Sequence, residues 1–450
     1  MQRFLVKNFG CRASQADGAA IEAGLAATGL VASNLHAADL VVLNTCTVTA
    51  TADDEVRQTV RRIRRERPEA RILVTGCYAQ RAPEEIAALE GVTLVVGNSH
   101  KASIPDLVSN KLRLADEHYH GQIEIGDIFA QTDFLSAPVE DAIGDRTRPN
   151  LKIQDGCNNR CSFCIIPYVR GKSRSAPPDR VVEQVRTLGA KYREVVLSGI
   201  NLGRWGRDLA PPGAPDVTMG NAGDTKTKLR LADLVRRLLD ETEIERLRLS
   251  SVEPMDFSDD LLQLMAASPR IARHVHAPLQ SGSDTALRRM HRKYRPRHYA
   301  DRIATARALM PDCAVGADVM TGFPGETEAE FEQNCQFIES LPFTYLHVFT
   351  YSERPGTPAA ESDQQVPTRI RRDRTQALRE LGARKNLEFR RSLVGKTLSC
   401  VTLDNASALS SNFVKVTLAK PREANRLEEI RIGGLTADGV SEAGALTVIS

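Results

Sequence analysis

Apolar and polar positions follow one another along the first hundred residues as alternating strands and helices. Short apolar runs at residues 4–6, 39–44, 71–75 and 92–97 are separated by helical patterns at 14–27, 50–67 and 83–89. Strands that are apolar throughout and are joined by helices are typical of a parallel sheet with both faces covered. The pattern therefore predicts a doubly wound α/β domain over residues 1–115.

A second alternating series begins near residue 150. Its strand candidates are residues 151–154, 194–197, 246–249, 274–277, 314–319 and 345–349. Helical patterns lie between them at 179–188, 229–240, 259–267, 297–310 and 328–340. This series predicts a partial (β/α)6 barrel over residues 147–367, with functional residues at the carboxyl ends of its strands. Residues 116–146, which have mixed patterning, are interpreted as a connector.

The pattern changes again after the predicted barrel. An arginine-rich helix is expected at residues 368–392, followed by short strands at 398–403, 413–418, 430–432 and 446–449. Closely spaced short strands predict a small all-β barrel over residues 393–450. The Pro- and Gly-rich stretch at 204–228 is aperiodic and predicts a loop, to which no role is assigned.

Composition narrows the class of protein. The chain has 450 residues, of which 42% are hydrophobic and 26% charged, as in soluble globular proteins with several domains. The net charge of +3 says little about partners. No apolar run has the length of a membrane span, and the first residues lack a signal-peptide pattern, so we expect a cytoplasmic protein without a membrane partner. Nine cysteines are too few for a disulfide scaffold, which favours metal or redox ligands.

Three cysteines lie close together in a C-x3-C-x2-C pattern, at Cys157, Cys161 and Cys164. A structural zinc site needs four ligands, and neither Cys nor His occurs again before His274. Three thiolates on a four-iron cluster would leave one iron open to a small molecule. The alternative is a zinc site whose fourth ligand comes from a distant part of the chain.

Three further cysteines each follow a predicted strand of the first domain: Cys11, Cys46 and Cys77. The carboxyl ends of parallel strands meet at one edge of a sheet, so we expect these thiols to form a second three-thiolate site. The alternative is three unrelated buried cysteines. The isolated cysteines Cys313, Cys335 and Cys400 are likewise interpreted as small buried apolar side chains without a functional role.

The residues around these cysteines resemble a known family. The run CNNRCSFCIIPYVRGKSRS at 157–175 resembles the cluster loop of radical S-adenosylmethionine enzymes, and most closely that of the methylthiotransferases. The motifs FGC at 9–11, NTCTVT at 44–49 and GCYAQ at 76–80 resemble the three cluster motifs of that family's N-terminal domain. Ser14 is a departure, because the family usually carries Asn there. Motifs at the ends of the predicted barrel strands also match in order, so the resemblance covers nearly the whole chain.

The resemblance implies two [4Fe-4S] clusters and S-adenosylmethionine as cofactors. The open iron held by the C-x3-C-x2-C cysteines would chelate S-adenosylmethionine, and one electron would cleave it to a 5′-deoxyadenosyl radical. The second cluster would carry the sulfur, which one S-adenosylmethionine methylates before a second yields the radical. An aromatic C–H bond resists a protein base, which is why such chemistry needs a cofactor radical.

Polar residues at the predicted strand ends are candidates for binding S-adenosylmethionine. Carboxylates there could accept hydrogen bonds from ribose hydroxyls or the amino group. No catalytic residue is assigned beyond the cluster ligands, and His276 either lines the cavity or is structural. The candidates for binding S-adenosylmethionine are Ser198, Asn201, Ser250, Glu253, Gln280 and Asp318. Each of them could instead only cap the end of its strand.

Two arginine runs, at residues 57–67 and 369–391, favour a nucleic-acid partner, although charge runs are also common on solvated helix faces. The C-terminal barrel resembles by position the TRAM domain, an RNA-binding module; a structural cap is the alternative. Within the family, the cluster loop and the motif SSVEP at 250–254 are most similar to the branch that modifies carbon 2 of threonylcarbamoyladenosine at tRNA position 37. The partners implied are tRNA and an electron donor such as flavodoxin or ferredoxin.

Other assignments remain open. The isopentenyladenosine branch is the nearest alternative, and a third branch modifies an aspartate of a ribosomal protein. From other classes, the chain could be an iron–sulfur electron carrier or a metal-stabilised RNA-binding protein without catalysis. Glycine-rich strand ends have no use in simple electron transfer, and zinc in place of iron would favour the RNA-binding protein. Cleavage of S-adenosylmethionine separates the enzyme from both.

Overall fold

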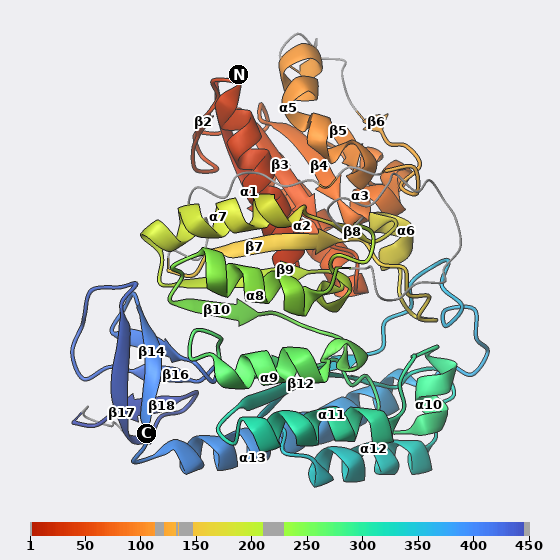
Figure 1. The fold of residues 1–450 in the computed structure, drawn as a ribbon. Coiled ribbons are helices and arrows are strands. Elements are labelled where there is room, and N and C mark those ends of the chain that lie inside the picture. The colour runs from red at the N-terminus through yellow and green to blue at the C-terminus, as the bar shows by residue number, and fades with distance from the viewer. Residues whose placement is uncertain (1, 113–120, 132–133, 135–146, 210–228, 445–450) are drawn as a thin grey trace. The chain divides into compact units, whose positions relative to one another are not determined.

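The computed structural model describes residues 2–112, 121–131, 134, 147–209 and 229–444. They divide into two compact units. Unit 1 comprises Met1–Val139, Lys152–Ala176 and Ser352–Glu361, and unit 2 comprises Glu140–Leu151, Pro177–Tyr351 and Ser362–Ser450. Figure 1 labels the helices and strands of both units where there is room. No described helix is long and apolar enough to span a membrane.

Unit 1 is built on a parallel sheet in the order β2-β1-β3-β4-β5-β6. The strands are β1 (Arg3–Asn8), β2 (Val31–Ala32), β3 (Leu40–Thr45), β4 (Arg71–Gly76), β5 (Val92–Gly97) and β6 (Gln122–Glu124). Every residue of β3 and β5 is buried, because helices cover both faces of the sheet. The predicted doubly wound domain is therefore confirmed.

Helices α1 (Arg12–Ala27) and α5 (Ile104–Leu107) pack on one face of this sheet through Ile21, Leu25 and Ile104. Helices α2 (Ala50–Glu66), α3 (Cys77–Arg81) and α4 (Pro83–Ala87) cover the other. Thr49 caps α2, since its Oγ1 accepts a hydrogen bond from the Ala52 amide at 3.2 Å. Strand β6 lies in the stretch expected to be a connector. It was missed because it is a partly exposed edge strand of three residues, too short for a pattern.

The rest of unit 1 is the loop that follows β7 (Asn150–Asp155), with α6 (Ile166–Arg170) and β8 (Arg174–Ser175). Strands β7 and β8 pair antiparallel, Gln154 opposite Ser175. This pairing closes the loop that carries Cys157, Cys161 and Cys164. The loop and the cysteines of the first domain therefore belong to the same compact unit.

Unit 2 contains the parallel strands β9 (Glu194–Gly199), β10 (Arg246–Leu249), β11 (His274–His276), β12 (Ala314–Thr321) and β13 (Tyr345–Thr350). β10 pairs with β9, and β12 pairs with both β11 and β13. Bridges from Leu247 to Ile271 and from Ser251 to His276 join the two sets. The carbonyl of Pro149, just before β7, accepts from the Val196 amide at 2.9 Å. The predicted series of six strands is thus present, and the α/β fold class is confirmed.

The helices between these strands are α7 (Pro178–Lys191), α8 (Leu231–Glu241), α9 (Asp259–Ala267), α10 (Asp284–Arg289), α11 (Pro296–Leu309) and α12 (Glu328–Ser340). All except α10 were predicted from periodicity. The part of the predicted loop from 210 to 228 and most of the predicted connector lie outside the described residues. Of the isolated cysteines, Cys313 and Cys400 are buried as expected, and Cys335 is half-buried.

After the barrel strands, α13 (Thr368–Leu393) leads into a closed barrel of five strands in the order β14-β15-β16-β18-β17. They are β14 (Thr397–Leu403), β15 (Ser407–Ser410), β16 (Lys415–Thr417), β17 (Leu427–Leu435) and β18 (Val440–Glu442). Its core includes Phe389 and Leu393 of α13. β15 and β18 were not predicted, and the strand expected at 446–449 lies outside the described residues.

Candidate active site

Cys11, Cys46 and Cys77, here called the sheet-edge thiols, follow the carboxyl ends of β1, β3 and β4. These three strands are neighbours in the sheet, so the prediction that one edge gathers the thiols is supported by the topology. Cys11 is exposed, whereas Cys46 and Cys77 are buried. Burial, followed by the nearby Cys77 and Cys11 thiols, raises the pKa of Cys46 to about 12. A thiol so placed ionises readily only when a cation is supplied.

Gly10 allows the chain to bring Cys11 over Cys46. Its φ is +92°, and a Cβ at this position would lie 2.5 Å from the Cβ of Cys46. Any other residue would therefore be strained and would also push the two loops apart. Soft sulfur donors gathered at one edge fit an iron–sulfur cluster with three protein ligands.

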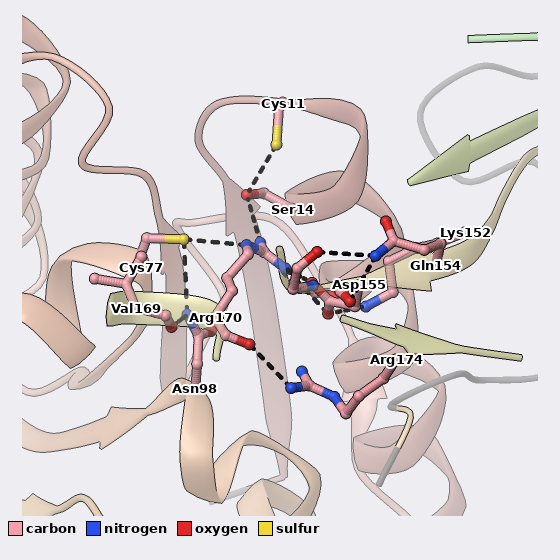
Figure 2. A network of polar contacts seen from close by, with 12 residues as sticks. Cys11, Ser14, Cys77, Asn98, Lys152, Gln154, Asp155, Val169, Arg170 and Arg174 are labelled. Carbon is pink, nitrogen blue, oxygen red and sulfur yellow. Dashed lines mark hydrogen bonds and ion pairs between the residues drawn. The ribbon is translucent and has the colours of Figure 1, made fainter. Parts of the chain in front are cut away.

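Arg170, from the second loop, makes polar contacts with the sheet-edge thiols and with Ser14 beside them (Figure 2). Its Nε donates to the Sγ of Cys77 at 3.3 Å, and its Nη2 donates to the Ser14 hydroxyl at 3.3 Å. The Ser14 hydroxyl lies 3.8 Å from the Sγ of Cys11. Ser14, noted above as a departure from the family pattern, thus accepts a hydrogen bond that links Arg170 to Cys11. The side-chain Nδ2 of Asn98 also donates to the Sγ of Cys77, at 3.6 Å.

A buried charge network supports Arg170. Its guanidinium pairs with Asp17 and Asp155, each at 3.0 Å. Lys101 pairs with Asp17 at 2.9 Å, and Lys152 pairs with both Asp17 and Asp155. Burial by itself would raise the pKa of Asp17, but the three cations around it hold the pKa well below its ordinary value. Burial would likewise raise the pKa of Asp155, but the positive charges of Lys152 and Arg170 lower it by more.

Cys157, Cys161 and Cys164, here called the loop thiols, are half-buried. Gly156 shapes their loop: its φ is +68°, and a Cβ would lie 2.0 Å from the Lys172 carbonyl oxygen. The Cys157 amide donates to the Gly171 carbonyl at 3.1 Å, and the Asn159 amide donates to the Cys157 Sγ at 3.4 Å. Amide donors aimed at sulfur favour the thiolate form that binds iron, so these residues also fit a three-thiolate cluster site.

The segment Ser352–Glu361, distant in sequence, also belongs to unit 1 and contacts residues beside both sets of thiols. Nη1 of Arg354 donates to the Asp53 carboxylate at 2.7 Å and to the Thr47 carbonyl, one residue after Cys46, at 3.3 Å. The amide of Ala359 donates to the Ser162 carbonyl, between two loop thiols, at 2.9 Å. The strand-end motif that contains Arg354 therefore positions backbone next to both sets of thiols.

The candidate residues for S-adenosylmethionine lie in unit 2, at or near the carboxyl ends of β9, β10, β11 and β12. The Ser198 hydroxyl is buried without a protein partner among the described residues, which leaves it available to a ligand. The Gln280 amide donates to the Asp318 carbonyl at 2.8 Å, so these two are brought together. Glu253 pairs with Arg292. Gln280 has a φ of +63°, a strained conformation of the kind found at functional sites.

Asp318 also takes part in a polar group with two histidines. Its Oδ1 lies 3.1 Å from His276 Nε2 and 3.2 Å from His347 Nδ1. Their ligand atoms lie within 4.8 Å of one another, so the three could hold a metal ion. Tyr345 places its hydroxyl 2.8 Å from His276 and 2.7 Å from His274. His276 is thus part of a hydrogen-bonded chain. Burial would raise the pKa of Asp318, but the two histidines lower it.

Both arginine runs contain buried or paired side chains as well as exposed ones. In α13, Arg371, Arg374 and Arg390 are buried, and Arg374 pairs with Glu326 at 2.9 Å. These arginines hold α13 in place and do not face solvent. The exposed members of the second run are Arg369, Arg372, Arg379, Arg384 and Arg391. In α2, Arg57 pairs with Asp54 at 2.5 Å and with Glu85. The exposed members of this run are Arg61, Arg62 and Arg65.

Comparisons with known proteins agree with this site. A model of the radical SAM superfamily matches residues 151–338, and one described as uncharacterized protein family UPF0004 matches residues 3–97. The threonylcarbamoyladenosine tRNA methylthiotransferase MtaB of Bacillus subtilis is 40% identical over 76% of this chain and 71% of its own. The protein of the same name from Aquifex aeolicus is 33% identical over 95% of this chain and 99% of its own.

This chain belongs to the radical S-adenosylmethionine methylthiotransferase family. The expected family is therefore confirmed, and with it the two [4Fe-4S] clusters and S-adenosylmethionine as cofactors. A second branch of the methylthiotransferases is also similar: the tRNA-2-methylthio-N(6)-dimethylallyladenosine synthase of Mycobacterium avium is 32% identical over 100% of this chain and 61% of its own. Among solved structures, the radical S-adenosylmethionine methyltransferase TsrM from Kitasatospora setae aligns with a TM-score of 0.55 and 15% identity over 80% of this chain and 74% of that one. This likeness concerns the fold alone.

Several residues of this methylthiotransferase site were missed from sequence. Arg170 lies in the quoted loop motif, but nothing local indicated that its side chain reaches the other set of thiols. Lys152 carried a usable signal, because it is a charged position inside the strand predicted at 151–154, and Asp155 follows directly after that strand. Asp17 and Lys101 carried none, since each looks like an ordinary polar residue of a helix or loop.

Proposed function

We propose that this methylthiotransferase transfers a methylthio group to carbon 2 of N6-threonylcarbamoyladenosine at position 37 of tRNA. One observation carries the proposal: two sets of three thiols share a compact unit in a chain that is 40% identical to a relative named for that modification. When bound, the loop cluster supplies the electron that cleaves S-adenosylmethionine, and the sheet-edge cluster supplies the sulfur. The sheet-edge thiols and the loop thiols are the proposed ligands.

The chain's own residues orient these groups. Arg170 and Ser14 hold Cys77 and Cys11 in place, and the Gly156 turn presents Cys157. The proposed contacts of S-adenosylmethionine are the strand-end residues of unit 2, among which the Ser198 hydroxyl offers a buried donor. A carboxylate kept ionised by two histidines, as in Asp318, suits the hydroxyl and amino groups of such a ligand.

The experiment that tests the function uses bacteria without their own tRNA methylthiotransferases. This chain is expressed in them, and digested tRNA nucleosides are analysed by mass spectrometry. We expect methylthio-threonylcarbamoyladenosine to appear, and a Cys46→Ala variant to remove it. If neither methylthiolated adenosine appears although both clusters are intact and the unmodified nucleosides are present, tRNA is not the substrate, and the ribosomal-protein branch is tested next.

The second candidate is the isopentenyladenosine substrate. The specific observation in its favour is the similarity to the Mycobacterium avium synthase over the full length of this chain. The same nucleoside analysis decides between the two, because methylthio-isopentenyladenosine has a different mass. We propose that either reaction takes place in the cytoplasm, with electrons from a flavodoxin or ferredoxin.

We also propose that the exposed arginines of α2 contact the tRNA backbone, and that the C-terminal barrel is a TRAM-like RNA-binding module. Arg61 and Arg65 lie one helical turn apart, which puts both on one face of α2. Reversing two charges, in Arg61→Glu with Arg65→Glu, is expected to weaken tRNA binding and to reduce its logarithmic salt slope by about two. Binding measured between low and moderate salt checks this.

A matched control for this prediction is Arg186→Glu with Arg236→Glu, which also reverses two charges. Arg186 lies on α7, and its side chain is 56% exposed. Arg236 lies on α8 and its side chain is 45% exposed, so both carry the same charge at comparable sites. We expect tRNA binding and its salt slope to stay unchanged in this variant. An equal loss in both variants would mean that overall charge, and not the α2 surface, governs binding.

A further inference from the structure

Arg170 lies in the loop that carries the loop thiols, but its side chain donates a hydrogen bond to one of the sheet-edge thiols. It ends α6, shortly after Cys164, and its side chain is 2% exposed. Its Nε donates to the Sγ of Cys77 at 3.3 Å. In Figure 2 a dashed line joins the guanidinium, a charged group, directly to that sulfur. An arginine buried this deeply is retained only with partners that offset the loss of hydration.

The partners leave a net positive charge. Two carboxylates, Asp17 and Asp155, lie among three cations, Lys101, Lys152 and Arg170, so two negative and three positive charges sum to +1. In the low dielectric of the interior this charge acts strongly on nearby groups. An arginine side chain does not lose its proton in proteins, so the guanidinium brings a full positive charge to within hydrogen-bond distance of the Cys77 sulfur.

Hydrogen bonds to cluster sulfurs and nearby positive charge both stabilise the reduced, more negative form of an iron–sulfur cluster. We propose that Arg170 is a positioning residue of the sheet-edge cluster: it orients the Cys77 sulfur and raises the reduction potential of that cluster. The inference rests on the proposed assignment of the sheet-edge thiols as cluster ligands. It implies that the loop for one cluster sets the electronic properties of the other, because Arg170 and the loop thiols share one loop.

A purely structural role for Arg170, as a partner of Asp17 and Asp155, is the competing explanation. Two variants separate them. Arg170→Met removes both the donor and one positive charge, which brings the network to zero. Adding Asp155→Asn to it restores the net charge to +1 but leaves Cys77 without the donor. Arg174→Met is the matched control, since Arg174 lies in the same loop and donates to the carbonyls of Arg170 and Lys172, at 3.0 and 3.1 Å.

The test uses the full-length chain with Cys157, Cys161 and Cys164 changed to alanine, so that one cluster remains. The cluster is reconstituted anaerobically, and its midpoint potential is measured by a redox titration followed by electron paramagnetic resonance. We expect a more negative potential in Arg170→Met, a smaller negative shift in the double variant, and no shift in Arg174→Met. Loss of the cluster from both Arg170 variants, with circular dichroism unchanged, would equally support the positioning role.

An unchanged potential in both Arg170 variants, with the cluster intact, would overturn the inference. A different result would contradict the proposed cluster site itself. If the chain that keeps Arg170 and only the sheet-edge thiols binds no [4Fe-4S] cluster, these thiols are not cluster ligands. The two results are distinct, because the first is seen with a bound cluster and the second before any arginine is changed.

Discussion

Replacing Cys157 by alanine is expected to abolish cleavage of S-adenosylmethionine. A four-iron cluster with an open iron needs three thiolates, and the loop offers three, so loss of one leaves it with two. The sheet-edge cluster has its own ligands and should persist, so the iron content is expected to fall by about half. Chromatography of 5′-deoxyadenosine and iron analysis of the purified protein measure the two effects.

Cys335→Ala is the control for that experiment. Cys335 is half-buried on α12 and belongs to unit 2, whereas both sets of thiols belong to unit 1, so we expect iron content and cleavage to match the unchanged chain. Cleavage that continues at the original rate in Cys157→Ala would show that this thiol is not a cluster ligand.

Replacing Asp17 by asparagine is expected to cause the largest loss of stability. The change removes the carboxylate that pairs with Lys101, Lys152 and Arg170, and leaves three buried cations with Asp155 alone. Breaking a buried ion pair by removing one partner costs about 3–5 kcal/mol. Hydrogen exchange of the backbone amides of α1 and β3 should show this loss as faster opening of unit 1.

The stabilising effect of Asp17 depends on pH. Its pKa is lower in the folded chain than in the unfolded chain, so its contribution is fully present above the unfolded value of about 3.9 and is lost as the pH falls toward the folded value. The difference in stability between the original chain and Asp17→Asn should therefore narrow below about pH 4. Glu22→Gln, a half-buried carboxyl on the same helix, is the control. An equal loss in both variants would mean that α1 tolerates no change.

The sequence allowed the architecture to be predicted because strands buried on both faces are apolar throughout. β3, β4 and β5 are such strands, and their predicted positions agree with the structure to within a residue or two. The short edge strand β6 and the barrel strands β15 and β18 escaped prediction, since short or partly exposed strands have no long apolar run. The second arginine run was only partly understood from sequence, because periodicity does not show that Arg374 pairs with a buried glutamate.

By itself, the sequence was enough to predict the chemistry. Six cysteines fall into two sets, each thiol after a predicted strand or inside a glycine-bordered loop, and they could be recognised because ligand type and spacing are local properties. The tertiary structure decided how the two sets are related. It placed Arg170 of one loop against Cys77 of the other set, and it surrounded that arginine with Asp17 and Asp155 from separate parts of the chain. The contacts of Arg170 with Cys77 and Asp17 join residues that are far apart in sequence, and such contacts depend on packing. A buried charge can be recognised only once its partners are known.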